Sequence, residues 1–90
     1  MKYQCPCCGF YTLPEKPTGT YCICKVCYWE DDNVQYYDPE FKGGANEECL
    51  NQARENYRGF GVSDIRFIDK VRKPLYEELP ENNQNEIAEW

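Results

Sequence analysis

Four cysteines in two pairs constrain the fold of this chain more than any other feature. Cys5 and Cys8 form the first pair and Cys24 and Cys27 the second, so the spacing is C-x2-C-x15-C-x2-C. Two residues between cysteines let a tight turn direct both sulfurs at one ion, and Gly9 can adopt the positive φ that such a turn needs. The spacing is typical of a four-thiolate zinc site. It predicts one zinc ion per chain, bound by Cys5, Cys8, Cys24 and Cys27.

The other three cysteines are expected to lie outside this site. Cys7 stands between two predicted ligands, and pairing it with either neighbour closes no usual turn. Cys22 falls on the opposite side of any strand that leads into the second pair, so its sulfur should point away from the ion. We interpret Cys7 and Cys22 as spare thiols and Cys49 as a small apolar side chain on a helix.

Other uses of seven cysteines fit the sequence less well. A disulfide framework is disfavoured because the count is odd and the residues from Met1 to Tyr3 open no signal-peptide pattern, so we expect a cytoplasmic protein. A thioredoxin-like pair needs a βαβ context, whereas residues 1–30 are rich in Gly, Pro and Tyr. Iron is the alternative metal, because four sulfurs in this arrangement accept it as well.

The charge of the chain limits its partners. Ninety residues form one small domain, to which a bound metal can add much stability, and the formal net charge is -6. Four thiolates and one zinc ion add a further -2, so we expect no binding to nucleic acid. The one basic cluster is diluted by aspartates and is interpreted as a solvated helix face; it comprises Arg66, Lys70, Arg72 and Lys73. No apolar run is long enough to predict a membrane span.

The expected fold class is small α+β, with a zinc-ribbon-like β-hairpin head whose two cysteine knuckles pack against one main helix and a short second helix. Short strands are predicted near residues 1–4, 10–13 and 20–23, and residues 34–37 are expected to be extended. The main helix is predicted over 46–58, or from Cys49 as an alternative start, and it should end at Gly59 or Gly61. The second helix should begin at Ser63-Asp64 and end before Pro74.

Three further expectations concern Trp29, the acidic turn and the tail. Trp29 should be partly buried against the second knuckle and the helix face of Leu50, Ala53 and Tyr57. Residues 30–33 should form an exposed acidic turn rather than a calcium loop. We predict a zinc-binding domain over 1–73 and a loose acidic tail over 74–90, in which Ile87 and Trp90 are able to dock.

Taken together, these residues resemble the cysteine-rich CPCC family of small bacterial proteins. The resemblance covers about the first two thirds of the chain, through Cys5-Pro6-Cys7-Cys8, Tyr11-Thr12-Leu13, the block from Cys24 to Asp32, and Gly43-Gly44-Ala45-Asn46 with the helix that follows. The family usually has a proline at position 25 and often a serine at 49, and it does not share Cys22. These departures leave the four predicted ligands in place. The resemblance implies no particular activity.

The residue types favour a protein that is not an enzyme. The chain has no histidine, so no Ser-His or Cys-His pair exists, and four protein ligands leave zinc no open position for water. We therefore expect an interaction module whose partner is another protein, and the net charge of -6 favours a partner with a basic surface. One alternative is a rubredoxin-like iron electron carrier, because Cys5-x-x-Cys8-Gly9-x-Tyr11 is similar to that family's first iron loop, although no glycine follows the second knuckle. The other is a thiol redox protein using Cys7 or Cys22.

Overall fold

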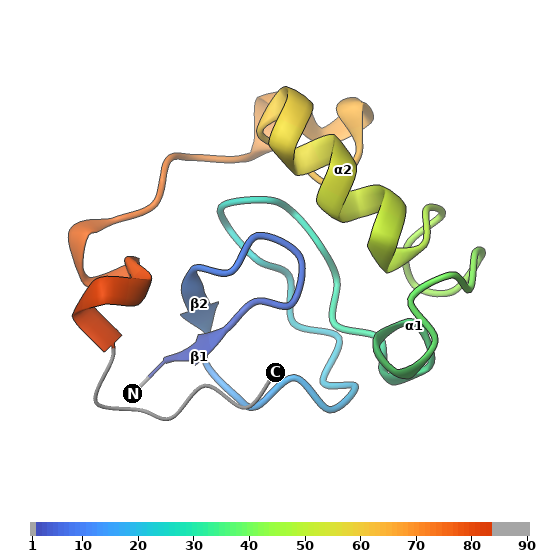
Figure 1. Cartoon of the computed structure of the whole chain (residues 1–90), viewed down its shortest axis with the longest axis horizontal. Coiled ribbons are helices and arrows are strands. Elements are labelled where there is room, and N and C mark those ends of the chain that lie inside the picture. Colours follow the sequence, from blue (N-terminus) through green and yellow to red (C-terminus); the bar gives the residue numbers. More distant parts are fainter. Residues whose placement is uncertain (1, 84–90) are drawn as a thin grey trace.

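A short antiparallel hairpin opens the chain and carries the first cysteine pair at its tip. The computed structural model describes residues 2–83. Strand β1 (Tyr3–Gln4) pairs with β2 (Tyr11–Leu13), with Tyr3 opposite Leu13 and Gln4 opposite Tyr11 (Figure 1). The register shifts between Tyr3 and Gln4. The strands expected near 1–4 and 10–13 are confirmed, and the fold is small α+β.

A second antiparallel arm carries the other cysteine pair. The amide of Tyr21 donates to the carbonyl of Asp31 at 2.9 Å, and the amide of Asp31 donates to Cys22 at 2.9 Å. Ile23 and Glu30 form a bridge between the two halves of this arm. The segment 20–23 is therefore paired as expected, but through isolated contacts rather than a continuous strand.

The two aspartates of the acidic turn are buried, so the expectation of an exposed turn is wrong for Asp31 and Asp32, whereas Asn33 is exposed. Asp31 is fully buried, and its Oδ2 accepts hydrogen bonds from the Gly19 amide at 2.9 Å and from Thr20 through both its amide and its hydroxyl. Asp32 accepts from the Ala45 amide at 2.9 Å. Burial opposes ionisation of Asp32, but its backbone donors outweigh that effect and lower its pKa.

Helix α1 (Asn33–Tyr37) replaces the extended piece expected over 34–37. Asp32 caps this helix, because its Oδ1 accepts from the amide of Gln35 at 3.1 Å. Gln35 is fully buried, and its side-chain amide donates to the carbonyls of Phe41, Asn46 and Glu48. The Asp32 cap and the hydrogen bonds from Gln35 to the following loop therefore outweigh the β propensity of the valine and tyrosines in this segment.

The main helix, α2 (Leu50–Phe60), follows the alternative start. Cys49 is its cap, with its Sγ accepting from the Gln52 amide at 3.4 Å, and Gly61 ends it with a φ of 80°. Leu50 and Ala53 are buried on its inner face. Cys49 is itself buried, so it is a small buried side chain at the helix start.

The C-terminal part forms short 3₁₀ helices, η1 (Ile65–Lys70), η2 (Tyr76–Glu78) and η3 (Pro80–Asn83). Asp64 caps η1, which is the second helix expected after Ser63. The predicted loose tail begins at residue 74, and the structure places η2 and η3 within it. Glu78 is 4% exposed and binds the Arg72 guanidinium through two contacts of 2.8 Å. The expectations for Ile87 and Trp90 lie outside the described residues, and the boundary after residue 73 stays a prediction.

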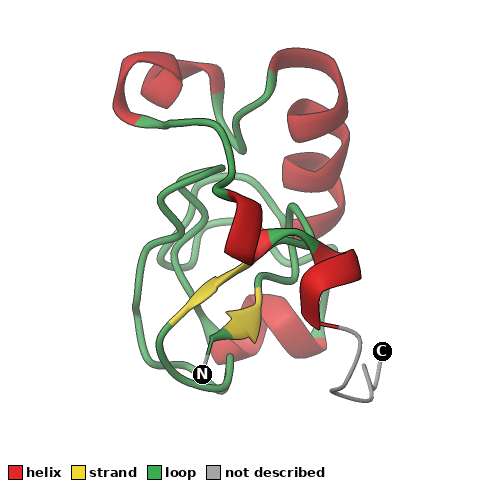
Figure 2. Cartoon of the chain, turned by 90° about the vertical axis from the view of Figure 1, so that its left-hand side faces the viewer, coloured by secondary structure: helices red, strands yellow, loops and turns green. Residues whose placement is uncertain are grey.

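The core lies between the two arms and α2. Figure 2 shows loops through the middle of the molecule and helices around it. Trp29 is 1% exposed and packs in this core, so its predicted burial is confirmed; its neighbours there are Cys5, Cys7, Leu13, Cys24, Val26, Cys27, Leu50 and Ala53, with Tyr57 packed against them. In the part of the chain that the structure describes, no helix has the length and apolar character to cross a membrane.

Candidate metal centre

The first cysteine pair sits in a tight turn closed by two backbone hydrogen bonds. The Cys5 amide donates to the carbonyl of Phe10 at 2.8 Å, and the Gly9 amide donates back to Cys5 at 2.9 Å. Gly9 has a φ of 85°, in the left-handed region that a glycine adopts without strain. The turn therefore uses Gly9 as the sequence predicts.

The second pair repeats this turn without a glycine. The Cys24 amide donates to the carbonyl of Trp29 at 2.9 Å, and the Tyr28 amide donates to Cys24 at 2.8 Å. Tyr28 occupies the position of Gly9 and has a φ of 70°. A left-handed tyrosine costs about 1 to 2 kcal/mol of conformational energy. Its ring packs on that of Phe67, with centroids 4.6 Å apart, and this contact offsets part of the cost.

The two turns bring four sulfurs together. The Sγ atoms of Cys5, Cys8, Cys24 and Cys27 all lie within 4.8 Å of one another. Cys5 and Cys27 are 3.6 Å apart, and Cys8 and Cys24 are 3.7 Å apart. A sulfur tetrahedron around zinc, with bonds of about 2.3 Å, has edges of about 3.8 Å. The four thiols therefore fit a single tetrahedral metal ion.

A comparison with known protein families places this site in context. The model of a family described as "Cysteine-rich CPCC" matches residues 3–78. The chain belongs to the cysteine-rich CPCC family. The match extends through both knuckles, α2 and η1 and ends in η2, so it reaches further than the first two thirds suggested by the motifs. No match was found among curated proteins.

The burial of the CPCC cluster is uneven among its four thiols. Cys5, Cys24 and Cys27 are fully buried, whereas Cys8 is half-buried. Hydrogen bonds from the Cys27, Cys5 and Cys8 thiols lower the pKa of Cys24, and Thr12 adds to this with its Oγ1 2.9 Å from the sulfur. The Val26 amide donates to the same sulfur at 3.4 Å.

The remaining thiols of the cluster stay protonated more readily than a free cysteine. Burial raises the pKa of Cys5 and of Cys27, and the interaction with the Cys24 sulfur raises that of Cys8. Metal binding to this cluster must displace protons, so its affinity should fall with falling pH.

Cys7 and Cys22 of this CPCC chain lie outside the four-sulfur group. Cys7 is buried and Cys22 is half-buried, and neither belongs to the four-sulfur group found among the described residues. Two supporting contacts had no signal in the sequence. Thr12 reaches Cys24 from β2, and Arg54 on α2 donates its Nε to the carbonyl of Pro6 at 2.9 Å, which ties the helix to the first knuckle.

Proposed function

We propose that this chain is a non-enzymatic domain that one structural zinc ion stabilises and that acts by binding another protein. The observation that carries the proposal is the convergence of four cysteine sulfurs, from two matching turns, within 4.8 Å of one another. Zinc bound by Cys5, Cys8, Cys24 and Cys27 would have all four positions filled, which is the arrangement of structural rather than catalytic sites.

Metal analysis tests the zinc assignment. The protein would be purified without an affinity tag or added metal, and its metal content and absorption spectrum measured. We expect one zinc per chain, no visible absorption, and loss of the folded state when a chelator removes the metal. A metal content near two per chain, or ligand mapping that includes Cys7 or Cys22, would contradict the assignment.

Iron is the second candidate metal, and the backbone of the second knuckle is compatible with a rubredoxin-like iron site. The sequence argument against a rubredoxin-like site is the missing glycine after Cys27, but Tyr28 adopts the same backbone conformation as Gly9. Intense visible absorption and one iron per chain would support an electron carrier instead. A thiol redox role for Cys7 or Cys22 predicts a reversible disulfide, detected as the loss of two titratable thiols under mild oxidation while the metal content is unchanged.

The partner is proposed from charge. The chain carries -6, and the metal centre would add -2, so its potential attracts a basic protein surface and repels phosphate backbones. Two residues of the basic cluster are paired within the fold, Arg66 with Glu47 and Asp64, and Arg72 with Glu78. We therefore expect no submicromolar binding to a generic oligonucleotide at physiological salt, measured by fluorescence anisotropy.

A further inference from the structure

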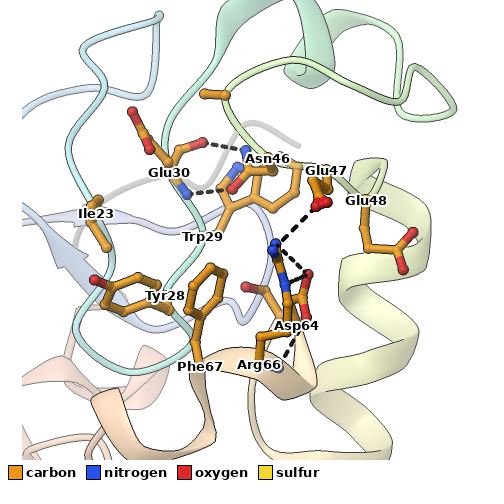
Figure 3. A pocket seen from close by; sticks show the side chains of 12 residues that line it. Ile23, Tyr28, Trp29, Glu30, Asn46, Glu47, Glu48, Asp64, Arg66 and Phe67 are labelled. Atoms are coloured by element: carbon orange, nitrogen blue, oxygen red, sulfur yellow. Dashed lines mark hydrogen bonds and ion pairs between the residues drawn. The ribbon is translucent and has the colours of Figure 1, made fainter.

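A small pocket opens beside the second knuckle. It has a volume of about 80 Å³ and lies between the second arm, the loop of residues 45–48 and the start of η1 (Figure 3). Ile23, Tyr28 and Phe67 contribute its apolar wall, where the two aromatic rings pack against each other. Small-molecule sites usually measure about 300 to 1,000 Å³, so this pocket is of a size for one side chain rather than a cofactor.

The lining of the pocket is strongly acidic. Four acidic residues, Glu30, Glu47, Glu48 and Asp64, line the pocket together with one basic residue, Arg66, which leaves a formal charge of -3. Glu47 and Asp64 point at the Arg66 guanidinium, whereas the carboxylates of Glu30 and Glu48 point away from it (Figure 3). Arg66 pairs with Glu47 at 3.1 Å and with Asp64 at 3.0 Å. Within residues 2–83, neither Glu30 nor Glu48 has a cation within ion-pair distance. Two carboxylates of the lining are therefore available to a cation from another molecule.

Arg66 shows how this surface holds a cation. Its guanidinium lies 5.0 Å from the centre of the Phe67 ring, while Glu47 and Asp64 bind it from the side (Figure 3). An aromatic face with flanking carboxylates is a favourable environment for a lysine or arginine head group. Arg66 therefore shows that the lining of this pocket can bind a guanidinium, and it forms no ion pair with Glu30 or Glu48.

We propose that this pocket is the docking site for a lysine or arginine side chain of the partner protein. The inference rests on the proposed function and adds the surface and the chemistry of the residue that it receives. Long basic side chains place an apolar stem on an apolar surface and keep the charged head in a polar setting. Here the stem lies along Ile23, Tyr28 and Phe67, and the head meets Glu30 or Glu48.

A titration with single amino-acid probes tests the site without knowledge of the partner. Nα-acetyl-lysine amide and Nα-acetyl-arginine amide would be added to ¹⁵N-labelled, zinc-loaded protein at low ionic strength. We expect saturable shifts at Tyr28, Phe67 and the Trp29 indole N–H, with a dissociation constant of roughly a millimolar, as suits ligands of this size. Nα-acetyl-norleucine amide, which has a similar stem without the charge, should bind at least about fivefold more weakly.

Charge-matched variants locate the binding. Changing Glu30→Gln and Glu48→Gln together should weaken lysine-amide binding about fivefold. Changing Glu55→Gln and Glu77→Gln, two exposed residues outside the pocket, removes the same net charge and should change it by less than twofold. If the variant with both Glu30→Gln and Glu48→Gln does not fold, the single variant Glu48→Gln is measured in its place.

The outcomes separate this inference from the function on which it rests. Equal effects of the two double variants, equal shifts with the norleucine amide, or shifts centred elsewhere would overturn the pocket while leaving a zinc-stabilised domain intact. A protein that holds no zinc, or that stays folded without it, would overturn the proposed function in the metal analysis before any probe is added.

Discussion

Replacing Trp29 by alanine should remove much of the stability of this domain. The side chain is 1% exposed and lies in the core with Cys27, Leu50 and Ala53. A tryptophan buries about 200 Å² of apolar surface, which at about 25 cal/mol per Å² corresponds to about 5 kcal/mol. Truncations of large aromatic residues cost about 3 to 5 kcal/mol, and a chain of this length has a total stability of roughly 5 to 13 kcal/mol.

Chemical denaturation followed by circular dichroism measures this loss, at one fixed free zinc concentration for all variants. Tyr76→Ala is the matched control, because Tyr76 is an aromatic residue that is 79% exposed, and it should stay within about 0.5 kcal/mol of the parent. Zinc affinity of the folded form should change less than stability. A loss below about 1 kcal/mol for Trp29→Ala would refute the reasoning.

A milder variant separates packing from hydrogen bonding at the same position. The Trp29 indole nitrogen is buried, and none of the described residues accepts a hydrogen bond from it. An unpaired buried donor costs about 1 to 3 kcal/mol. Trp29→Phe loses ring volume but also removes that cost, so its net destabilisation should be at most about 2 kcal/mol. A loss as large as that of Trp29→Ala would mean that the indole N–H makes an important hydrogen bond.

Three further predictions follow from the other buried groups. Cys24→Ser should abolish stoichiometric metal binding and unfold the domain, whereas Cys49→Ser should keep one metal per chain by elemental analysis and remain folded. Asp31→Asn should cost about 2 to 3 kcal/mol in the same denaturation assay, because a charged acceptor of three hydrogen bonds is replaced by a neutral one. The Arg72 guanidinium lowers the pKa of Glu78, so ionised Glu78 stabilises the fold above its unfolded pKa and that contribution fades as pH falls through the folded pKa. Glu78→Gln should therefore be less stable by about 1 to 2 kcal/mol at neutral pH, with a difference that shrinks on acidification; a constant difference down to pH 3 would contradict the assignment.

The four-cysteine cluster and the main helix could be predicted because their signals are local. The two-residue gaps place each cysteine pair in one turn, and the cap at Cys49 with the glycine at 61 bounds α2 within a few residues. The burial of Trp29 also followed from its position two residues after Cys27. Each of these features depends on residues that lie close together in the chain.

The burial of the acidic turn was mispredicted because hydrogen-bond partners of Asp31 and Asp32 lie 11 to 13 residues away in the sequence. Asp31 accepts from Gly19 and Thr20, and Asp32 from Ala45, so these carboxylates are buried acceptors and not solvent-facing charges. Glu78 lies in the segment that was predicted as a tail from its composition, and it is buried and paired with Arg72. Composition alone does not reveal which acidic residue finds a partner.

The second knuckle also joins the candidate metal site to the C-terminal half of the chain through its own backbone carbonyls. The Ser63 amide donates to the carbonyl of Cys27 at 2.7 Å, and the Arg72 amide donates to that of Lys25 at 3.1 Å. Both carbonyls are oriented by a turn that a bound ion would hold in place. Amide hydrogen exchange at these two positions should therefore report metal occupancy from the C-terminal half of the chain.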